Sequence, residues 1–495
     1  MSDELNYVLQ ARREKVAALE AMGVPPFAYG FEREHFAAAC AGLLGDAEEG
    51  PAVQLAGRVV ALRAHGKTTF AHLGDPSGRV QLYFKKDLVG ERAYAVCELL
   101  DLGDVIGVRG PLFRTRTGEV TVKVESVELL AKSLRPLPFG KEEVVDGAVV
   151  RHSAFADGEQ RSRQRYADLA VHPEVRALFA ARSRMTGAVR AFLDALGYLE
   201  VETPVLQPLY GGAAAKPFTT HHNALDMPLY LRIADELYLK RLIVGGLERV
   251  YEIGHDFRNE GIDRTHNPEF TMLEFYQAYA DYGDMMTVVE ALVTEAARAV
   301  AAVPGFAERV PAFAPPFPRI EWVPSLNAAL GRDAMALNEA ELRAEAARRG
   351  VERPGGLSRP KLLDELFQAL VETTIEAPTF VVDYPQELSP LAKPKRGNPG
   401  LTERFELFAN GKELANAFSE LNDPIDQRAR LEAQARLRAA GDEEAVGVDE
   451  DYLRAMEYGM PPMGGVGVGM DRLFMYLTGT PHIRDAILFP TMLPE

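Results

Sequence analysis

One stretch near the middle of the chain alternates charged or aromatic residues with apolar ones. Arg258 and Glu260 are two positions apart, and a loop containing His266 follows them. If the next residues form a strand, one of its faces carries Phe270, Met272, Glu274 and Tyr276. We expect Arg258 and Glu260 to share a face of the strand before the loop. Because buried carboxylates and guanidinium groups need partners, this pattern predicts a site for a charged ligand; a solvated sheet face with ion pairs is the alternative.

A second acidic segment lies further along the chain. Asn410-Gly411 is typical of a tight β-hairpin, and Asn416 and Glu420 then fall on one face of its second strand. Glu413 is out of phase with them, so a β-bulge must occur if it serves the same site. Glu406 and Glu413 could bind Mg²⁺ through their carboxylates. Acidic pairs on a hairpin can also be plain surface charges.

The third segment is rich in glycine and runs from residue 464 to residue 472. Its glycines, Gly467 among them, allow a backbone to approach a ligand closely. Arg472 stands at the start of an expected helix, where a guanidinium suits a polyphosphate. Tight packing of this helix on the glycine-rich strand is the alternative interpretation.

A large α+β region from 173 to 495 must position these three segments. Hydrophobic periodicity predicts strands at 199–207, 249–260, 269–277, 403–420 and 464–468. It predicts helices at 284–302, 338–349, 358–375, 425–439 and 471–478, with a mainly helical insertion at about 284–400. Hairpin-like turns between the strands favour a mainly antiparallel sheet. We find no glycine-rich phosphate loop or dinucleotide-binding fingerprint that opens a helix.

Three further regions precede this one. Residues 1–50 form an N-terminal extension that starts with an amphipathic helix, and residues 51–134 read as five short strands with one helix after the third. That pattern suits a small barrel of the oligonucleotide-binding (OB) kind. Residues 135–172, rich in proline, glycine and charge, form a linker. Phe70 and Gln81 fall on the second and third strands, where an exposed aromatic ring could stack on a base; core packing of Phe70 is the alternative.

The bulk composition agrees with an ordinary globular protein. The 495 residues are 47% hydrophobic and 26% charged, and the net charge is −17. This acidity argues against non-specific nucleic-acid binding by the whole surface, although residues 51–140 carry more Lys and Arg than Asp and Glu. Cys40 and Cys97 lie in no metal-binding pattern. We expect no membrane span and a cytoplasmic location.

Together the segments resemble the signature motifs of class II aminoacyl-tRNA synthetases. Residues 197–204, which end in Pro204, resemble motif 1; residues 257–261 with 266–271 resemble motif 2; and residues 465–472 resemble motif 3. The match continues through 232–240, 391–393 and 416–423, and with the barrel it covers nearly the whole chain. It is specific to the lysyl branch. The resemblance implies an enzyme that activates L-lysine with ATP and transfers it to tRNA(Lys), with Mg²⁺ as cofactor and a homodimer formed around Pro204.

The resemblance also implies a role for each residue of the site. It assigns catalysis to Arg258 and Arg472. It assigns ATP binding to Arg258, Glu260, His266, Phe270, Gly467 and Arg472, with Phe270 under the adenine and Arg472 across its other side. It assigns lysine binding to Gly212, Glu236, Glu274, Tyr276, Asn416 and Glu420. Glu406 and Glu413 would bind the metal, and Phe70 and Gln81 the anticodon.

Local charge favours lysine over other substrates of the subgroup. A lysine side chain presents a compact cation, which Glu274, Tyr276 and Glu420 would neutralise, whereas the aspartyl branch needs an anionic substrate that these glutamates would repel. An aspartyl or asparaginyl enzyme is therefore the weaker alternative. A protein that transfers lysine to another protein would resemble the catalytic half without the barrel. A non-catalytic RNA-binding relative would be expected to lose Arg258, Glu413 and Arg472.

Overall fold

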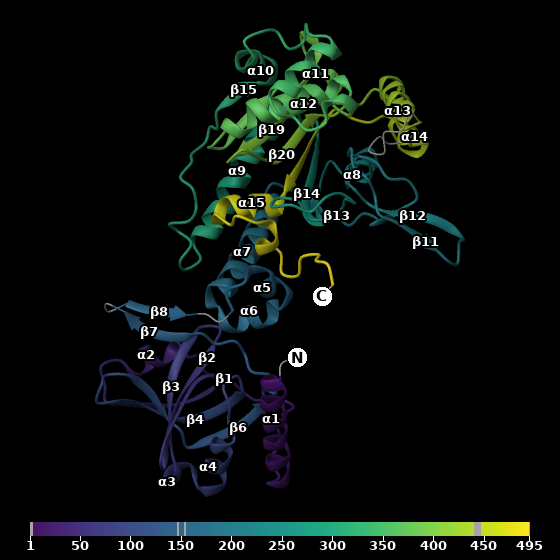
Figure 1. Ribbon diagram of the computed structural model, residues 1–495. Coiled ribbons are helices and arrows are strands. Elements are labelled where there is room, and N and C mark those ends of the chain that lie inside the picture. Colours follow the sequence, from purple (N-terminus) through teal and green to yellow (C-terminus); the bar gives the residue numbers. More distant parts are fainter. Residues whose placement is uncertain (1–2, 146–147, 153–154, 440–446, 495) are drawn as a thin grey trace. The chain divides into compact units, whose positions relative to one another are not determined.

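A computed structural model describes residues 3–145, 148–152, 155–439 and 447–494. The chain divides into two compact units, Met1–Pro173 and Glu174–Glu495 (Figure 1). Each unit has its own hydrophobic core. Within the described ranges, we find no helix with the length and apolar character that a membrane crossing requires.

The N-terminal unit is built on a closed six-stranded sheet. Its strands are β1 (Glu49–His65), β2 (Thr68–Asp75), β3 (Gly78–Lys85), β4 (Val105–Arg114), β5 (Val120–Lys123) and β6 (Ser126–Ala131). They pair in the order β1-β2-β3-β5-β4-β6, and an additional β1–β4 pairing closes the barrel. Alternate residues such as Leu73, Leu82 and Leu112 are buried inside it, which is the period-two pattern that the sequence carries. The OB-fold prediction is confirmed, and β6 is a sixth strand that follows the predicted five.

Helices surround this barrel within the same unit. They are α1 (Asp3–Ala21), α2 (Ala39–Leu44), α3 (Lys86–Val89) and α4 (Glu91–Glu98). The stretch after the barrel, which the sequence shows as a proline- and glycine-rich linker, contains a hairpin of β7 (Lys141–Val145) and β8 (Ala148–His152) and the helices α5 (Gly158–Arg163) and α6 (Arg165–Val171). Residues 146–147 and 153–154 of the predicted linker lie outside the described ranges.

The C-terminal unit is organised around an eight-stranded sheet with the order β15-β16-β19-β20-β21-β14-β13-β9. The strands are β9 (Leu199–Glu200), β13 (Arg249–Phe257), β14 (Glu269–Ala278), β15 (Arg319–Glu321), β16 (Thr379–Val382), β19 (Arg404–Ala409), β20 (Lys412–Ser419) and β21 (Met463–Gly469). Among the described strands of this sheet, only the two outer pairs, β15–β16 and β13–β9, are parallel. The predicted mainly antiparallel sheet is confirmed.

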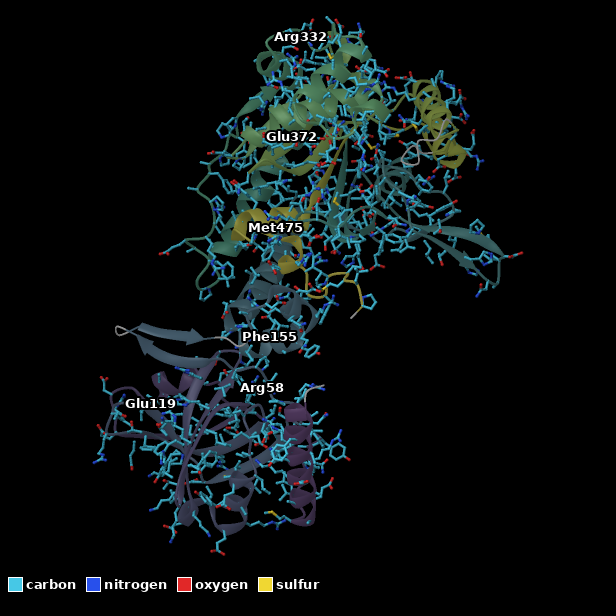
Figure 2. All side chains as sticks on the ribbon, in the orientation of Figure 1. Arg58, Glu119, Phe155, Arg332, Glu372 and Met475 are labelled. Atoms are coloured by element: carbon cyan, nitrogen blue, oxygen red, sulfur yellow. The ribbon has the colours of Figure 1, made fainter. Side chains whose placement is uncertain are left out.

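Helices cover one face of this sheet and leave the other for the site. The covering helices are α7 (Pro173–Ala195), α9 (Tyr282–Ala301) and α15 (Met470–Thr478), whose apolar residues join those of the sheet in the largest core. Met475 of α15, labelled in Figure 2, belongs to this core. On β14, Leu273 and Phe275 point into the core, so the alternate residues of the strand must face the opposite side.

Smaller elements pack around the edges of the sheet. The helices α10 (Trp322–Leu330), α11 (Glu339–Arg348) and α12 (Arg359–Leu370) form a separate core around Trp322. Beyond them the unit contains α8 (Glu236–Val244), α13 (Pro424–Ala439), α14 (Glu450–Glu457), α16 (Ile483–Ala486), and the short strands β10 (Leu206–Gln207), β11 (Thr219–His222), β12 (Met227–Leu231), β17 (Pro394–Lys395) and β18 (Asn398–Thr402).

Two strand predictions are wrong in their extent. β13 ends at Phe257, so Arg258 and Glu260 lie beyond the strand and do not share one of its faces. The backbone N–H of Arg258 donates to the carbonyl of Pro268, and that of Asn259 donates to Lys216, which takes the chain out of the sheet. The segment 199–207 contains only the two-residue strands β9 and β10, because Thr203-Pro204 interrupts the ladder.

Candidate active site

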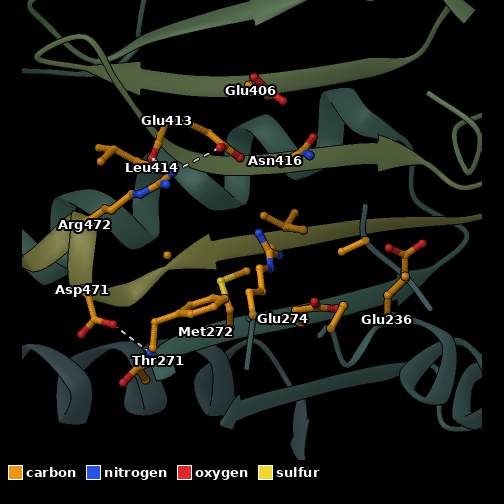
Figure 3. A pocket seen from close by; sticks show the side chains of 18 of the residues that line it. Glu236, Thr271, Met272, Glu274, Glu406, Glu413, Leu414, Asn416, Asp471 and Arg472 are labelled. Atoms are coloured by element: carbon orange, nitrogen blue, oxygen red, sulfur yellow. Dashed lines mark hydrogen bonds and ion pairs between the residues drawn. The ribbon is translucent and has the colours of Figure 1, made fainter. Parts of the chain in front are cut away.

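A cavity of about 360 Å³ lies on the face of the large sheet that the core helices leave open. It is lined by every residue that the sequence assigned to ATP, lysine or metal binding. Figure 3 shows that the cavity is polar at both ends: Glu236 and Glu274 lie toward one end and Arg472 and Asp471 toward the other. Glu406, Glu413 and Asn416 come from β19 and β20 along one side. Segments far apart in the sequence therefore meet at one site.

Glycines of β21 make room for the side chains at the acidic end. Gly465 pairs with Tyr276 on β14 on one side and with Phe418 on β20 on the other. A Cβ atom on Gly465 would lie 2.2 Å from Oε1 of Glu420 and 2.3 Å from the Tyr276 ring. Both side chains therefore lie over this glycine, and an L side chain there would displace them. Glycine in the interior of a strand normally weakens it, and the space that these two side chains need explains why glycine is found here.

Gly465→Ala should selectively damage the acidic end of the cavity. Because the new methyl group must push Glu420 and Tyr276 aside, we expect the KM for lysine to rise about tenfold or more while the KM for ATP changes little. The measurement is ATP–pyrophosphate exchange with either substrate varied. Gly355→Ala is a matched control, since a Cβ at Gly355 meets nothing within 4 Å. Unchanged lysine kinetics in folded Gly465→Ala would contradict this geometry.

The acidic end combines two buried glutamates with a phenol. Glu274 is 5% exposed and accepts a hydrogen bond from the Tyr276 hydroxyl at 2.9 Å, while Glu420 is 1% exposed. Burial raises the pKa of Glu274 well above its usual value, and nearby Asp256 and Glu236 raise it further. Burial also raises the pKa of Glu420 to about 8, against the opposing effect of Lys240. Buried carboxylates with raised pKa values are suited to a cationic ligand that restores their charge.

A fully buried arginine network supports the neighbouring residue Glu236. Arg232 forms ion pairs with Asp235 at 2.9 Å and Glu252 at 2.6 Å. Glu252 also accepts a 2.7 Å hydrogen bond from the hydroxyl of Thr203. Because Asp235 precedes the first residue of α8, the network fixes the start of that helix and hence Glu236. Gly212 approaches this helix in a left-handed conformation with φ +88°, where a side chain would be strained.

Cationic and aromatic groups dominate the opposite end. The guanidinium of Arg258 lies 5.1 Å from the centroid of the Phe270 ring. Arg472 lies 3.3 Å from Glu413 and 2.9 Å from Nε2 of His266. The Phe270 ring therefore has Arg258 over it, whereas Arg472 is held by Glu413 and His266. Rings and cations with this spacing suit an aromatic base and its phosphates.

Asp263 orients His266 within the loop after β13. Its carboxylate lies 2.8 Å from Nδ1 of His266, and it also accepts backbone hydrogen bonds from Thr265 and His266. Although burial opposes this, the bonds lower the pKa of Asp263 to about 2. An ionised Asp263 favours a proton on Nδ1, which directs Nε2 toward Arg472 and the cavity.

Glu406 and Glu413 lie close to one another on paired strands. The β19–β20 register shifts after Leu407, so that Leu414 is extra and Glu413 reaches the cavity face; the predicted bulge is confirmed. Asn410 and Gly411 both have positive φ, as the hairpin prediction requires. Glu406 accepts a 2.8 Å hydrogen bond from Tyr384 and pairs with Arg404, and burial raises its pKa to about 7. Both carboxylates line the cavity, and a pair of this kind fits Mg²⁺, which is bound through one or two carboxylates and substrate oxygens.

Some residues of the site were not found from the sequence. Arg404 lines the cavity and has Glu406 two positions later, so the same period-two pattern could have identified it. Asp263 could also have been identified, because it lies three residues before His266 in the same loop, where a carboxylate can hydrogen-bond the imidazole. Lys240, which pairs with Glu236 and Glu420, has no such signal, because a lysine in an amphipathic helix usually faces water.

The barrel keeps Phe70 and Gln81 on its outer face. Phe70 is half-buried and outside the barrel core, 4.9 Å from the Tyr83 ring, which itself lies 6.0 Å from Phe113. Phe70 is therefore not a member of the barrel core. Gln81 donates to Glu119 at 2.7 Å and accepts from Thr121 at 2.8 Å. Glu119, labelled in Figure 2, precedes β5 and also pairs with His72. The face thus joins an aromatic patch to a hydrogen-bonding patch.

Comparisons with known proteins agree with both halves of this description. Residues 157–493 match the family of class II tRNA synthetases (D, K and N), and residues 53–130 match the OB-fold nucleic-acid-binding domain. The chain is 52% identical to the lysine–tRNA ligase of Moorella thermoacetica over 99% of its length and 98% of the relative's. It is 50% identical to the lysine–tRNA ligases of Carboxydothermus hydrogenoformans, over 99% of both chains, and of Pelotomaculum thermopropionicum, over 100% of this chain and 96% of the relative. The chain belongs to the class II aminoacyl-tRNA synthetases, in the branch of the lysine–tRNA ligases.

Proposed function

We propose that the cavity is where this lysine–tRNA ligase activates lysine with ATP, forming lysyl-adenylate and pyrophosphate, before transferring the lysyl group to tRNA(Lys). The main support for this proposal is the opposite charge of the two ends of the cavity. Buried glutamates lie at one end, and Arg258, Arg472 and an aromatic ring lie at the other. Lysine brings ammonium groups to the first end, and ATP brings a base and phosphates to the second. An anionic amino acid would meet repulsion from Glu274 and Glu420, which disfavours the aspartyl alternative.

Each substrate group has a partner in this arrangement. Glu274, Tyr276 and Glu420 receive the ε-ammonium group; Glu236 and the backbone at Gly212 receive the α-amino group; and Asn416 and Arg258 receive the carboxylate. The adenine stacks on Phe270. Glu260, His266 and the close approach allowed by Gly467 position the nucleotide, with Arg472 near its phosphates. Glu406 and Glu413 would hold Mg²⁺, which supplies neutralising charge to the phosphates when bound.

The chemistry needs positioning and charge, and no protein nucleophile. An oxygen of the lysine carboxylate attacks the α-phosphorus, and the bond from that phosphorus to the pyrophosphate oxygen breaks. Arg258 neutralises charge that develops on the α-phosphate, and Arg472 stabilises the leaving pyrophosphate. A hydroxyl of the tRNA 3′-terminal ribose then attacks the lysyl carbonyl, which forms the ester and releases AMP and the hydroxyl proton.

The direct test is pyrophosphate exchange with each amino acid in turn, followed by charging of total tRNA. Exchange that depends on lysine, and charging confined to lysine-accepting tRNA, is the expected result. Exchange with aspartate or asparagine in place of lysine would overturn the substrate. Exchange without tRNA charging would favour the protein-modifying alternative.

The pKa of Glu420 predicts how lysine use depends on pH. Burial raises this pKa to about 8, so the carboxyl is largely neutral below that pH, and the neutral form cannot neutralise an ammonium group. The kcat/KM for lysine should therefore fall by up to about tenfold for each pH unit below about 8. The measurement is exchange between pH 6 and 9. The kcat/KM for ATP, measured with saturating lysine, should not show this fall at low pH. A kcat/KM for lysine that does not change with pH would contradict the proposal.

The outer face of the barrel is proposed to bind the anticodon. Phe70 supports this role because its half-buried ring, beside Tyr83, can stack on an unpaired base, and Gln81 can hydrogen-bond a base edge. Phe70→Ala should raise the KM for tRNA about 5- to 150-fold, since base stacking contributes about 1–3 kcal/mol, and should leave pyrophosphate exchange unchanged. Phe70→Leu is the matched control for packing, because it keeps apolar volume without the ring. Normal charging by both variants would exclude this role.

We further propose that the chain forms a homodimer through the segment around Pro204. Three apolar side chains beside this proline are exposed within the unit: Leu199 at 51%, Val205 at 40% and Leu206 at 49%. β9 is also an edge strand of the large sheet. Grouped apolar exposure at a sheet edge is typical of a protein–protein interface. We also propose a cytoplasmic location, because the chain is similar over its whole length to bacterial lysine–tRNA ligases.

A further inference from the structure

Lys240 is a fully buried cation immediately behind the acidic end of the cavity. Its side chain is 0% exposed, and its ammonium group pairs with Oε1 of Glu236 and Oε2 of Glu420. Tyr276, whose ring centroid is 5.9 Å away, and Tyr452 of α14 are the other titratable groups beside it. Lysine is almost never fully buried without a partner, so two glutamates on one lysine indicate a specific arrangement.

In each of the two glutamates, one carboxylate oxygen contacts Lys240 and the other lies at the cavity. Oε1 of Glu420 lies over Gly465, within 2.2 Å of where a Cβ would stand, while its other oxygen contacts Lys240. Oε2 of Glu236 lies beside Gly212, 3.8 Å from the corresponding Cβ position, while its other oxygen contacts Lys240. Gly212 and Gly465 both line the cavity. One oxygen of each carboxylate is therefore fixed from behind, and the other is presented to a ligand.

The charges of this group fit a dibasic amino acid. When ionised, Glu236, Glu274 and Glu420 outnumber Lys240 by two, which is one negative charge for each ammonium group of lysine. Without Lys240, Glu236 and Glu420 would lie in a buried site as uncompensated like charges. Glu420 would lose the cation that lowers its pKa and would keep Glu236 as a like-charged neighbour that raises it.

We propose that Lys240 is a positioning residue for the activation of lysine: it holds one oxygen of Glu236 and one of Glu420 from behind, so that the other oxygen of each carboxylate is turned toward the ammonium groups of the substrate. This inference rests on the proposed placement of lysine in the cavity. It predicts that Lys240 controls the affinity for lysine and its pH dependence, although it does not touch the substrate. A purely structural lysine, which only ties α8 to the end of β20, would affect stability alone.

The test is Lys240→Met, which keeps length and removes charge. We expect the KM for lysine to rise at least about tenfold, with the KM for ATP within about twofold. The pH below which kcat/KM for lysine falls should rise by about one unit or more, because the cation that lowers the pKa of Glu420 is gone. Arg241→Met is the matched control: it removes the next cation on α8, whose partner Asp449 lies outside the cavity, and should change neither value.

Other outcomes separate this inference from the proposed function. If folded Lys240→Met has the lysine KM and the pH dependence of the parent, the inference is wrong, whatever the melting temperature of the variant. If Lys240→Met does not fold, the double variant with Glu420→Gln removes the unbalanced buried charge. Because Glu236 has also lost its partner, the lysine KM of the folded double variant should be several-fold above that of Glu420→Gln alone, and equal values would contradict the inference. If Glu420→Gln itself leaves the lysine KM unchanged, the placement of lysine fails as well.

Discussion

Replacing Arg258 by alanine should lower lysine-dependent ATP–pyrophosphate exchange by roughly 10³-fold, close to abolishing it. Arg258 follows the end of β13 and lies over Phe270 in the cavity, where its guanidinium can meet both the α-phosphate and the lysine carboxylate. These two groups carry negative charge that must be brought together before the bond forms. No other residue is proposed to contact both, so the loss of Arg258 removes positioning and charge neutralisation at once.

The control for this variant is Arg298→Ala. Arg298 is 70% exposed on α9 and pairs with Glu295 on the same helix, so its loss should leave exchange unchanged. Circular dichroism and thermal unfolding of Arg258→Ala should match the parent, because the side chain lies at the cavity. A folded Arg258→Ala with exchange within a few-fold of the parent would refute the assigned role.

Glu274→Gln should raise the KM for lysine by about 30- to 4,000-fold. The carboxylate is buried, it accepts from Tyr276, and in the proposed complex it pairs with the ε-ammonium group. Removing one partner of a buried, hydrogen-bonded charge pair costs about 2–5 kcal/mol, and each 1.4 kcal/mol is tenfold in affinity. Glutamine keeps the shape, so the lost charge accounts for the effect. Glu420→Gln should act in the same direction.

An uncharged analogue makes this prediction specific. Norleucine, which ends in a methyl group where lysine has its ammonium-bearing carbon, should be a very poor substrate of the parent because it leaves the acidic residues without a partner. The Glu274→Gln variant should discriminate less between lysine and norleucine. If the variant keeps the full preference for lysine, Glu274 does not recognise the side-chain charge.

The chemistry-bearing segments could be predicted because strand periodicity places alternate residues on one face. Met272, Glu274 and Tyr276 line the cavity as predicted. Glu413 is out of phase with Asn416 and Glu420 in the sequence, and the β-bulge that this required is present. Arg258 and Glu260 also line the cavity, but they lie beyond the strand that was predicted to carry them. Pairing ends at Phe257 because the backbone turns toward Pro268 and Lys216, a tertiary effect that local periodicity does not contain.

What the sequence did not predict depends on contacts between distant segments. Arg232 and Lys240 are separated by a few residues in the chain, yet each is buried only because Glu252 or Glu420 reaches it from another element. In isolation both read as surface cations of an ordinary helix or loop. The role of Gly465 is likewise visible only when Tyr276 and Glu420 converge on it.

A crystal structure of the enzyme with bound lysine tests the central claim most directly. The side-chain amine should lie at hydrogen-bonding distance, about 2.7–3.2 Å, from carboxylate oxygens of Glu274 and Glu420 and near the Tyr276 hydroxyl. A lysine bound in the cavity with this amine directed to solvent, and with both glutamates paired elsewhere, would contradict the electrostatic basis of substrate recognition.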